Sequence, residues 1–232
     1  MKILSKRYKE ALSKIEKGKV YDKEEALKLL KETSTTKFDS TVEVSVRLNL
    51  DTKKADQQLR GALVLPKGTG KTKRTLVICN AAKLEEAKAS GSDFYGDKDM
   101  IEKIEKENFF DYDVIIATPD MMPHLGKIGK ILGPKGLMPN PKTGTVTNDI
   151  KKAVNDVKMG QVEYRCDSYG IVHGIIGKSS FSVEDLKENL NAYVNAIIKA
   201  KPTGAKGKYI ASIYLSTTMG PSIKISETNF DN

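Results

Sequence analysis

The chain has 232 residues, with 39 Lys and Arg against 30 Asp and Glu, which gives a net charge of +9. A chain of this length can bury a sizeable core in one large domain or two ordinary ones. The positive charge favours an anionic partner, of which nucleic acid is the commonest. No apolar run approaches the ~18 residues that a bilayer span needs, so the sequence predicts a soluble protein with no membrane partner.

The amino-terminal residues lack the apolar stretch and cleavage site of a secretory signal, which predicts a cytoplasmic protein. The two cysteines, Cys79 and Cys166, and the two histidines, His124 and His173, are widely separated in the sequence. This spacing favours neither a zinc site nor a disulfide framework, and it leaves few residues for histidine-based catalysis. We therefore expect no metal, no cofactor and no enzymatic activity.

The first part of the chain predicts two short helices followed by strands. Ser5 can cap a helix whose apolar residues recur at helical spacing up to Gly18, and Asp22 can open a second helix. Apolar and polar residues alternate over 41–50, which predicts a strand with one buried face. A shorter strand is predicted at 61–65, and the Pro- and Gly-containing break that follows it indicates a domain boundary.

The middle of the chain has a different pattern. TLVIC at 75–79 and DVIIA at 113–117 are continuous apolar runs, which are typical of parallel strands covered on both faces. Helical stretches are predicted around 82–89 and 98–107 between these strands. The order of strand, two helices and strand indicates an α/β unit.

The last part returns to alternating strands. The predicted elements are a helix at about 148–158 opened by Thr147 or Asn148, strands at 161–165 and 169–173, a helix at 182–199 capped by Ser182, and a final strand at 208–217. The sequence therefore predicts an α/β protein of two domains. Residues 1–66 and 160–232 form a discontinuous domain, and residues 67–159 form a domain inserted into it.

Gly70-Lys71-Thr72 is similar to the end of a phosphate-binding loop. Leu65 stands where that pattern requires a glycine, however, and a predicted strand rather than a helix follows. A nucleotide-hydrolysing enzyme is therefore disfavoured, and a turn between domains is the better interpretation.

Residues 121–148 contain five glycines, four prolines and four lysines, but no Asp or Glu. Gly126–Gly129 and Gly133–Gly136 match the G-x-x-G of a KH nucleic-acid module, although the nearby prolines argue against a second flanking helix. Composition leaves an ordered surface loop and an anion-binding segment equally open. The second interpretation would use Lys127, Lys130, Lys135 and Lys142.

The segment Thr217-Thr218-Met219-Gly220 ends the last predicted strand. A turn is the simpler interpretation, because Gly220 tolerates unusual backbone angles. Alternatively, the hydroxyls of Thr217 and Thr218, with Met219 and Gly220, could approach a folded RNA and bind its 2′-hydroxyls. Phe38, which follows Lys37, could likewise belong to the core or pack against a base or ribose.

Five segments taken together resemble the family of ribosomal protein L-one, the protein of the mobile stalk of the large ribosomal subunit. They are KFDSTVEV at 37–44, ATPDMM at 117–122, GKILGPKGLMPNPKTGTV at 129–146, GKSSF at 177–181 and TTMGPS at 217–222. The resemblance extends from about residue 2 to residue 225.

This resemblance implies a discontinuous split α/β sandwich with an inserted Rossmann-like α/β domain. It implies a cytoplasmic constituent of the large ribosomal subunit that binds large-subunit ribosomal RNA near the exit site and assists release of deacylated tRNA. Members in many bacteria also repress their own operon messenger, so exit-site tRNA and that messenger are expected partners. We expect the free protein to be a monomer. The alternatives are a stand-alone RNA-binding module and a structural interaction protein that acts off the ribosome.

The resemblance also implies an RNA-binding surface in the first domain. Its principal residues are Lys37, Phe38, Thr41, Ser212, Thr218, Met219 and Gly220, with Asp167 and Ser179 as secondary candidates. A net charge spread over folded surfaces suits recognition of RNA shape better than bulk neutralisation of phosphates. We therefore expect a salt dependence shallower than the roughly tenth-power dependence of strongly electrostatic binders.

Overall fold

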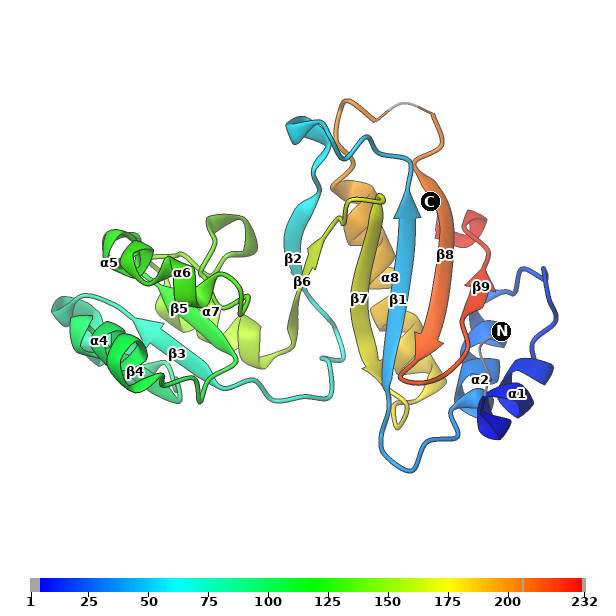
Figure 1. Cartoon of the computed structure of the whole chain (residues 1–232), viewed down its shortest axis with the longest axis horizontal. Coiled ribbons are helices and arrows are strands. Elements are labelled where there is room, and N and C mark those ends of the chain that lie inside the picture. The colour runs from blue at the N-terminus through cyan, green and yellow to red at the C-terminus, as the bar shows by residue number, and fades with distance from the viewer. Residues whose placement is uncertain (1–4, 206, 231–232) are drawn as a thin grey trace. The chain divides into compact units, whose positions relative to one another are not determined.

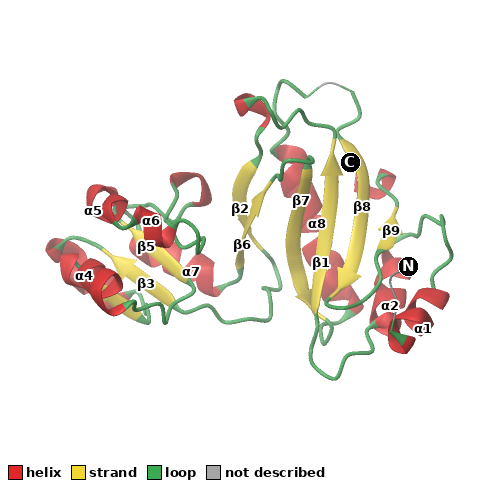
Figure 2. Ribbon diagram, viewed as in Figure 1, coloured by secondary structure: helices red, strands yellow, loops and turns green. Residues whose placement is uncertain are grey.

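The computed structural model describes residues 5–205 and 207–230 and divides into two compact units (Figure 1). Unit 1 combines the two ends of the chain, up to Gly70 and from Val162 onward, and unit 2 is Lys71–Gln161. Both units mix helices with strands, which confirms the predicted α/β class (Figure 2).

Unit 1 is built on a four-stranded antiparallel sheet in the order β7-β1-β8-β9. The strands are β1 Thr41–Leu48, β7 Ile171–Lys178, β8 Ile210–Thr217 and β9 Ile223–Ile225. The apolar residues of β1 are buried and its polar residues point to the other face, as the alternating pattern predicts. A separate two-stranded sheet pairs β2 Arg60–Val64 with β6 Gln161–Arg165.

Helices cover the apolar face of this sheet. α8 Val183–Lys199 packs on β7 and α2 Lys23–Thr33 packs on β8 and β9, while α1 Lys6–Ser13 precedes them in the chain. Ser5 caps α1 and Ser182 caps α8 through side-chain hydrogen bonds, as predicted. The other face of the sheet carries exposed polar side chains of β1, such as Glu43 and Arg47.

Two predictions for unit 1 need correction. α1 ends at Ser13 rather than near Gly18, and β7 runs from Ile171 to Lys178 rather than over 169–173. β7 contains glycines that interrupt the apolar pattern, but it pairs with β1 along its length. At Gly174 a Cβ would lie 2.3 Å from ring atoms of Tyr193, so the glycine lets α8 approach the strand rather than ending it.

Unit 2 contains a parallel sheet in the order β4-β3-β5, with β3 Thr75–Ile78, β4 Phe94–Gly96 and β5 Val114–Ala117. Its helices are α3 Leu84–Ala89, α4 Lys98–Glu107, α5 Met122–Lys127, α6 Gly129–Leu132 and α7 Ile150–Lys158. Leu76 and Ile78 pack with α4, α5 and α6, whereas Val77 packs with α3 and α7. Burial on both faces explains why β3 and β5 are continuously apolar.

The structure also corrects the prediction for residues 121–148. This stretch is not a loop throughout, because it contains both α5 and α6. Pro123 lies in the first turn of α5, where its missing N–H costs nothing, and the other three prolines follow α6. The N-cap of α7 is Asp149 rather than Thr147 or Asn148, and the short strand β4 has no counterpart among the predicted elements.

Within residues 5–205 and 207–230, no helix is long and apolar enough to span a bilayer. The same residues contain no group of three or more His, Cys, Asp or Glu side chains placed to hold a metal ion.

Candidate nucleic-acid interface

The first residue of β1 is joined to the residue that follows β8. The Thr41 N–H donates to Thr218 Oγ1 at 3.1 Å, and the Thr218 N–H donates to the Thr41 carbonyl at 3.0 Å. The side chain of Thr218 is therefore held between two strands. We call the residues gathered here, namely Arg7, 37–41, 178–179 and 217–220, the strand-end surface.

Met219 is the most prominent residue of this surface. Its side chain is 67% exposed, and its φ of 66° lies in the left-handed region that non-glycine residues rarely adopt. The Gly220 N–H donates to the Thr217 carbonyl at 2.8 Å, and Arg7 Nη2 donates to the Met219 carbonyl at 3.3 Å. Hydrogen bonds on both sides thus hold a flexible apolar side chain out into solvent.

Thr217 differs from its neighbours because its side chain is only 4% exposed and lies on the core side of β8. A Cβ at Gly220 would lie 2.2 Å from Thr217 Oγ1, so the turn closes tightly over this hydroxyl. The structure therefore gives Thr217 a supporting position beneath the turn instead of direct access to an RNA.

The segment before β1 contributes an exposed aromatic ring. Phe38 is 56% exposed and Lys37 is also exposed, so neither belongs to the core. Ser179 Oγ accepts from the Ser40 N–H at 3.2 Å and donates to Asp39 Oδ1 at 2.9 Å. Ser179 therefore fixes the segment that leads into β1.

Asp39 is an anion at the rim of this surface. Burial raises the pKa of its carboxyl, but hydrogen bonds from Ser180 and Ser179 outweigh that effect and leave the pKa below its ordinary value. Its two oxygens are used by hydroxyl and N–H donors of Ser179 and Ser180. The negative charge is thus neutralised in part by local donors, which limits its repulsion of a phosphate.

Two basic residues of the surface were absent from the sequence-based set. Lys178 Nζ donates to Thr41 Oγ1 at 2.9 Å, and Arg7 reaches the Met219 carbonyl from α1. Lys178 lies within GKSSF, so that segment contained a signal for it. Arg7 comes from a different element far away in the sequence, and only the fold brings it to Met219.

Ser212 and Asp167 lie at the opposite end of the sheet. Ser212 pairs with Arg47, six residues along β1 from Thr41, which corresponds to about 20 Å of strand. Asp167 Oδ1 accepts from the Tyr169 and Ile171 N–H groups at 2.9 and 2.8 Å and so shapes the turn before β7. Burial opposes the charged form of this carboxyl, yet these hydrogen bonds lower its pKa. Neither residue is part of the strand-end surface.

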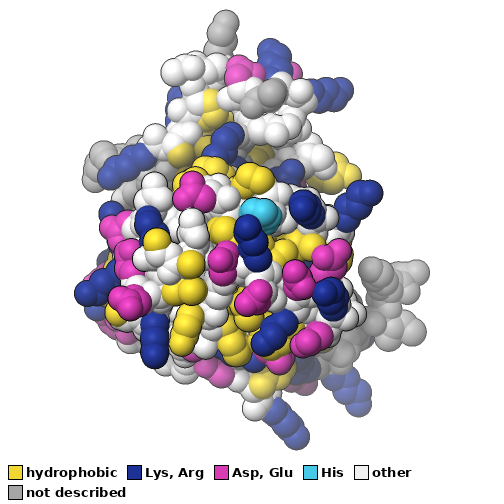
Figure 3. Space-filling view, turned by 90° about the vertical axis from the view of Figure 1, so that its left-hand side faces the viewer, with side chains coloured by type: hydrophobic (Ala, Val, Ile, Leu, Met, Phe, Trp, Pro, Cys, Tyr) yellow, Lys and Arg dark blue, Asp and Glu magenta, His cyan; other side chains and the backbone are white. Residues whose placement is uncertain are grey.

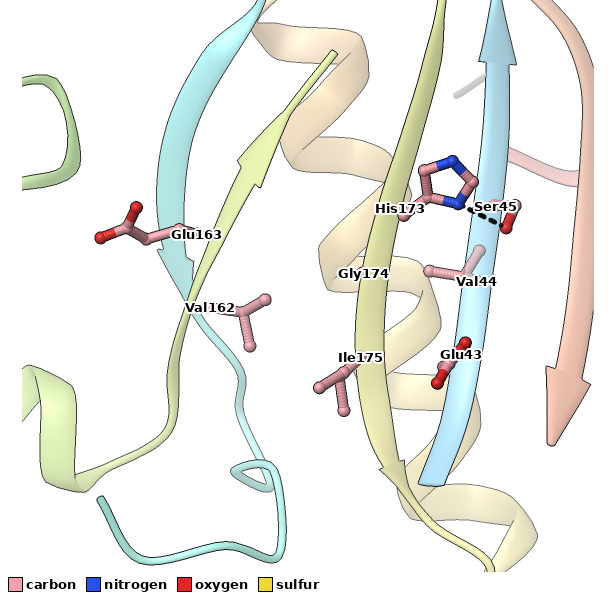
Figure 4. Close-up of a pocket in the computed structure, with 8 residues that line it drawn as sticks. All are labelled: Glu43, Val44, Ser45, Val162, Glu163, His173, Gly174 and Ile175. Carbon is pink, nitrogen blue, oxygen red and sulfur yellow. Dashed lines mark hydrogen bonds between the residues drawn. The ribbon is translucent and has the colours of Figure 1, made fainter. Parts of the chain in front are cut away.

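A shallow cavity lies between these two ends of the sheet (Figure 4). It is lined by Glu43, Val44, Ser45, Val162, Glu163, His173, Gly174 and Ile175. The figure shows His173 turned toward Ser45, whose Oγ lies 3.0 Å from His173 Nδ1. Two carboxylates in the lining make the cavity unfavourable for a phosphate, so we do not include it in the interface.

The four lysines predicted as a secondary basic segment all lie in unit 2 and all are exposed. Lys127 ends α5, Lys130 lies in α6, and Lys142 lies in the 3₁₀ turn Pro141–Thr143. Lys135 Nζ is 3.8 Å from the centre of the Phe110 ring. Figure 3, which looks onto the part of the molecule at the left of Figure 1, shows basic and acidic side chains interspersed over that face.

A family model identifies the class of protein to which this chain belongs. The model of the Ribosomal protein L1p/L10e family matches residues 30–221. The chain belongs to this family of structural, non-enzymatic proteins, which confirms the resemblance seen in five sequence segments.

Curated relatives match over nearly their whole length and are named large ribosomal subunit protein uL1. That of Mycoplasma capricolum is 60% identical, over 96% of this chain and 98% of its own. That of Mesoplasma florum is 58% identical, over 96% and 97%, and that of Macrococcus caseolyticus is 55% identical, over 98% of both chains.

Proposed function

We propose that this chain is a structural component of the large ribosomal subunit and that its strand-end surface binds a folded site on large-subunit ribosomal RNA. The observation that carries this proposal is Met219, an exposed apolar side chain on a left-handed backbone held by hydrogen bonds. Strained backbone at an exposed position is typical of functional sites. The names of the curated relatives support the ribosomal part of the proposal.

The chemistry of this surface suits RNA. The Thr218 hydroxyl and the backbone around Gly220 can exchange hydrogen bonds with 2′-hydroxyls, which distinguish RNA from DNA. Phe38 offers a ring face to an unstacked base, and Met219 can fill a shallow groove. Arg7, Lys37 and Lys178 supply positive charge for nearby phosphates. The surface thus combines shape, stacking and a small amount of charge.

Several finer functions follow from the same proposal. We propose that unit 1, close to the predicted domain of residues 1–66 and 160–232, carries the main RNA affinity, and that unit 2 is the inserted domain predicted at 67–159. The protein acts in the cytoplasm, is a monomer when free, and assists release of exit-site tRNA. A messenger that mimics the ribosomal RNA site would occupy the same surface, which provides a physical basis for repression of its own operon.

The salt dependence of binding tests this account. If Arg7, Lys37 and Lys178 each neutralise one phosphate, log affinity should fall with log salt concentration with a slope of about −2 to −3. We expect this slope for the purified protein and a fragment of the ribosomal RNA stalk, measured by fluorescence anisotropy at several salt concentrations. Arg7→Gln should make the slope shallower by about one.

Lys88 and Lys103 are exposed lysines of unit 2, so the Lys88→Gln/Lys103→Gln protein is the matched charge control and should keep the parental slope. A slope near −10 would show that bulk charge dominates and would contradict shape recognition. Binding of the stalk fragment no tighter than that of an unrelated RNA would favour a stand-alone RNA-binding module. The absence of RNA affinity would favour a structural interaction protein off the ribosome.

A further inference from the structure

The segment that joins α5 to α6 in unit 2 has an apolar inner face and a basic outer face. Leu125, Ile128 and Leu132 are buried in the core of unit 2. Gly126, Lys127 and Lys130 are exposed. Apolar packing against the core of unit 2 therefore holds the segment in place, while its basic residues face solvent.

The junction between the two helices is held by backbone hydrogen bonds. The N–H groups of Ile131 and Leu132 both donate to the Ile128 carbonyl, at 2.9 and 3.1 Å, and the Gly133 N–H donates to the Gly129 carbonyl at 2.8 Å. Gly126 and Lys127 are the last two residues of α5 and Gly129 is the first residue of α6, so the Gly126-Lys-Ile-Gly129 motif spans the junction. KH modules use a G-x-x-G segment at such a position to clamp a nucleic-acid backbone.

The basic residues of this segment have no acidic neighbour within the segment itself. Residues 121–148 contain no Asp or Glu. The ion pairs found among the described residues of unit 2 use other basic side chains, namely Lys71, Arg74, Lys106 and Lys158. Lys127 and Lys130 therefore keep their charge available for an external anion.

The glycines of this segment are not required by the packing of the protein. A Cβ at Gly126 or Gly129 would meet no atom within 4 Å, and neither residue has a positive φ. At Gly133, by contrast, a Cβ would lie 2.9 Å from the Gly129 carbonyl oxygen. Glycine weakens a helix relative to alanine, so Gly126 and Gly129 cost stability without serving the fold. Because glycine has no side chain, both positions instead permit close approach of an RNA backbone.

We propose that Gly126, Lys127, Gly129 and Lys130 form a second RNA contact, which binds the sugar–phosphate backbone of single-stranded RNA. The backbone at exposed Gly126 and partly exposed Gly129 accommodates the RNA chain, and the two ammonium groups bind consecutive phosphates. This contact lies in unit 2 and goes beyond the function proposed for the strand-end surface. Lys135 and Lys142 are not part of it, because Lys135 stacks on Phe110 and Lys142 lies in a separate turn.

The test uses the full chain carrying Met219→Ala, in which the strand-end surface binds RNA more weakly. Binding of a short fluorescent oligouridine is measured by anisotropy at low salt. We expect Lys127→Gln/Lys130→Gln to weaken binding about tenfold, and Lys88→Gln/Lys103→Gln, which removes the same charge from α3 and α4, to change it less than about twofold. Gly129→Ala should weaken binding about threefold or more while the melting temperature stays the same or rises.

Equal losses in the two double lysine variants would indicate unspecific electrostatics and would overturn the proposal. So would parental affinity in Gly129→Ala, equal affinity for duplex RNA, or no binding of oligouridine by the starting protein. The same variants in the chain with native Met219 should bind the stalk fragment with parental affinity, so failure here is distinguishable from failure of the strand-end surface.

Discussion

Replacing Met219 with alanine is expected to weaken binding of the ribosomal RNA stalk fragment about tenfold. The side chain is 67% exposed in the free protein, and burying a methionine against RNA contributes about 1.5 kcal/mol or more, which corresponds to that factor. Met159→Ala is the matched control, because Met159 is 56% exposed at the end of α7 in unit 2. We expect the control to bind with parental affinity.

A glycine at the same position separates binding from folding. Met219 has a φ of 66°, which costs an L-residue about 1 kcal/mol and costs glycine almost nothing. Met219→Gly should therefore leave the free energy of unfolding unchanged or raise it by up to about 1 kcal/mol, since backbone entropy offsets part of the gain. It should nevertheless bind the fragment no better than Met219→Ala. Parental affinity in both variants would remove Met219 from the interface.

The second large effect concerns Asn189, a residue of α8 whose polar side chain is completely buried. Its Oδ1 accepts from the Lys67 N–H at 3.0 Å, and its Nδ2 donates to the carbonyls of Gly68 and Ile176 at 3.0 and 2.8 Å. Asn189 therefore links the backbone of Lys67 and Gly68, where the chain leaves unit 1, to β7 through hydrogen bonds. Asn189→Ala should lower the free energy of unfolding of unit 1 by about 3 kcal/mol, because these backbone groups lose their partner.

Two further variants identify the cause of that loss. Asn189→Leu fills the same space without hydrogen bonds and should be about as destabilising as alanine. Asn195→Ala, at an exposed position of the same helix, should change stability by less than about 0.5 kcal/mol. Hydrogen exchange of α8 amides across a urea series reports on unit 1 separately from unit 2. Restored stability in Asn189→Leu would show that packing rather than hydrogen bonding is decisive.

Much of the fold could be predicted because local patterns and tertiary burial agree. The structure contains the strand predicted from the alternation of β1, the strands predicted from the apolar runs of β3 and β5, and the serine cap predicted for α8.

The elements that the sequence did not predict have identifiable causes. α5 and α6 were missed because proline and glycine content says little about where in a turn each residue lies. β4 has only three residues, too few for a periodic pattern.

The candidate interface was predictable only in part. Exposure of Phe38 and Met219 could not be decided from spacing, since either residue could have joined the core. The buried position of Thr217 follows from the register of β8, which is fixed by its pairing with β1. Arg7 reaches Met219 from 212 residues away in the sequence, and no local pattern encodes that contact.

Oxidation of methionine in the presence and absence of RNA tests the strand-end surface most directly, because one molecule contains both the probe and its control. Met219 and Met159 are both well exposed, so both should be oxidised readily in the free protein. With the stalk fragment bound, we expect mass spectrometry to show strong protection of Met219 and undiminished oxidation of Met159. Equal oxidation of Met219 with and without bound RNA would contradict the central claim that this turn is where the protein holds ribosomal RNA.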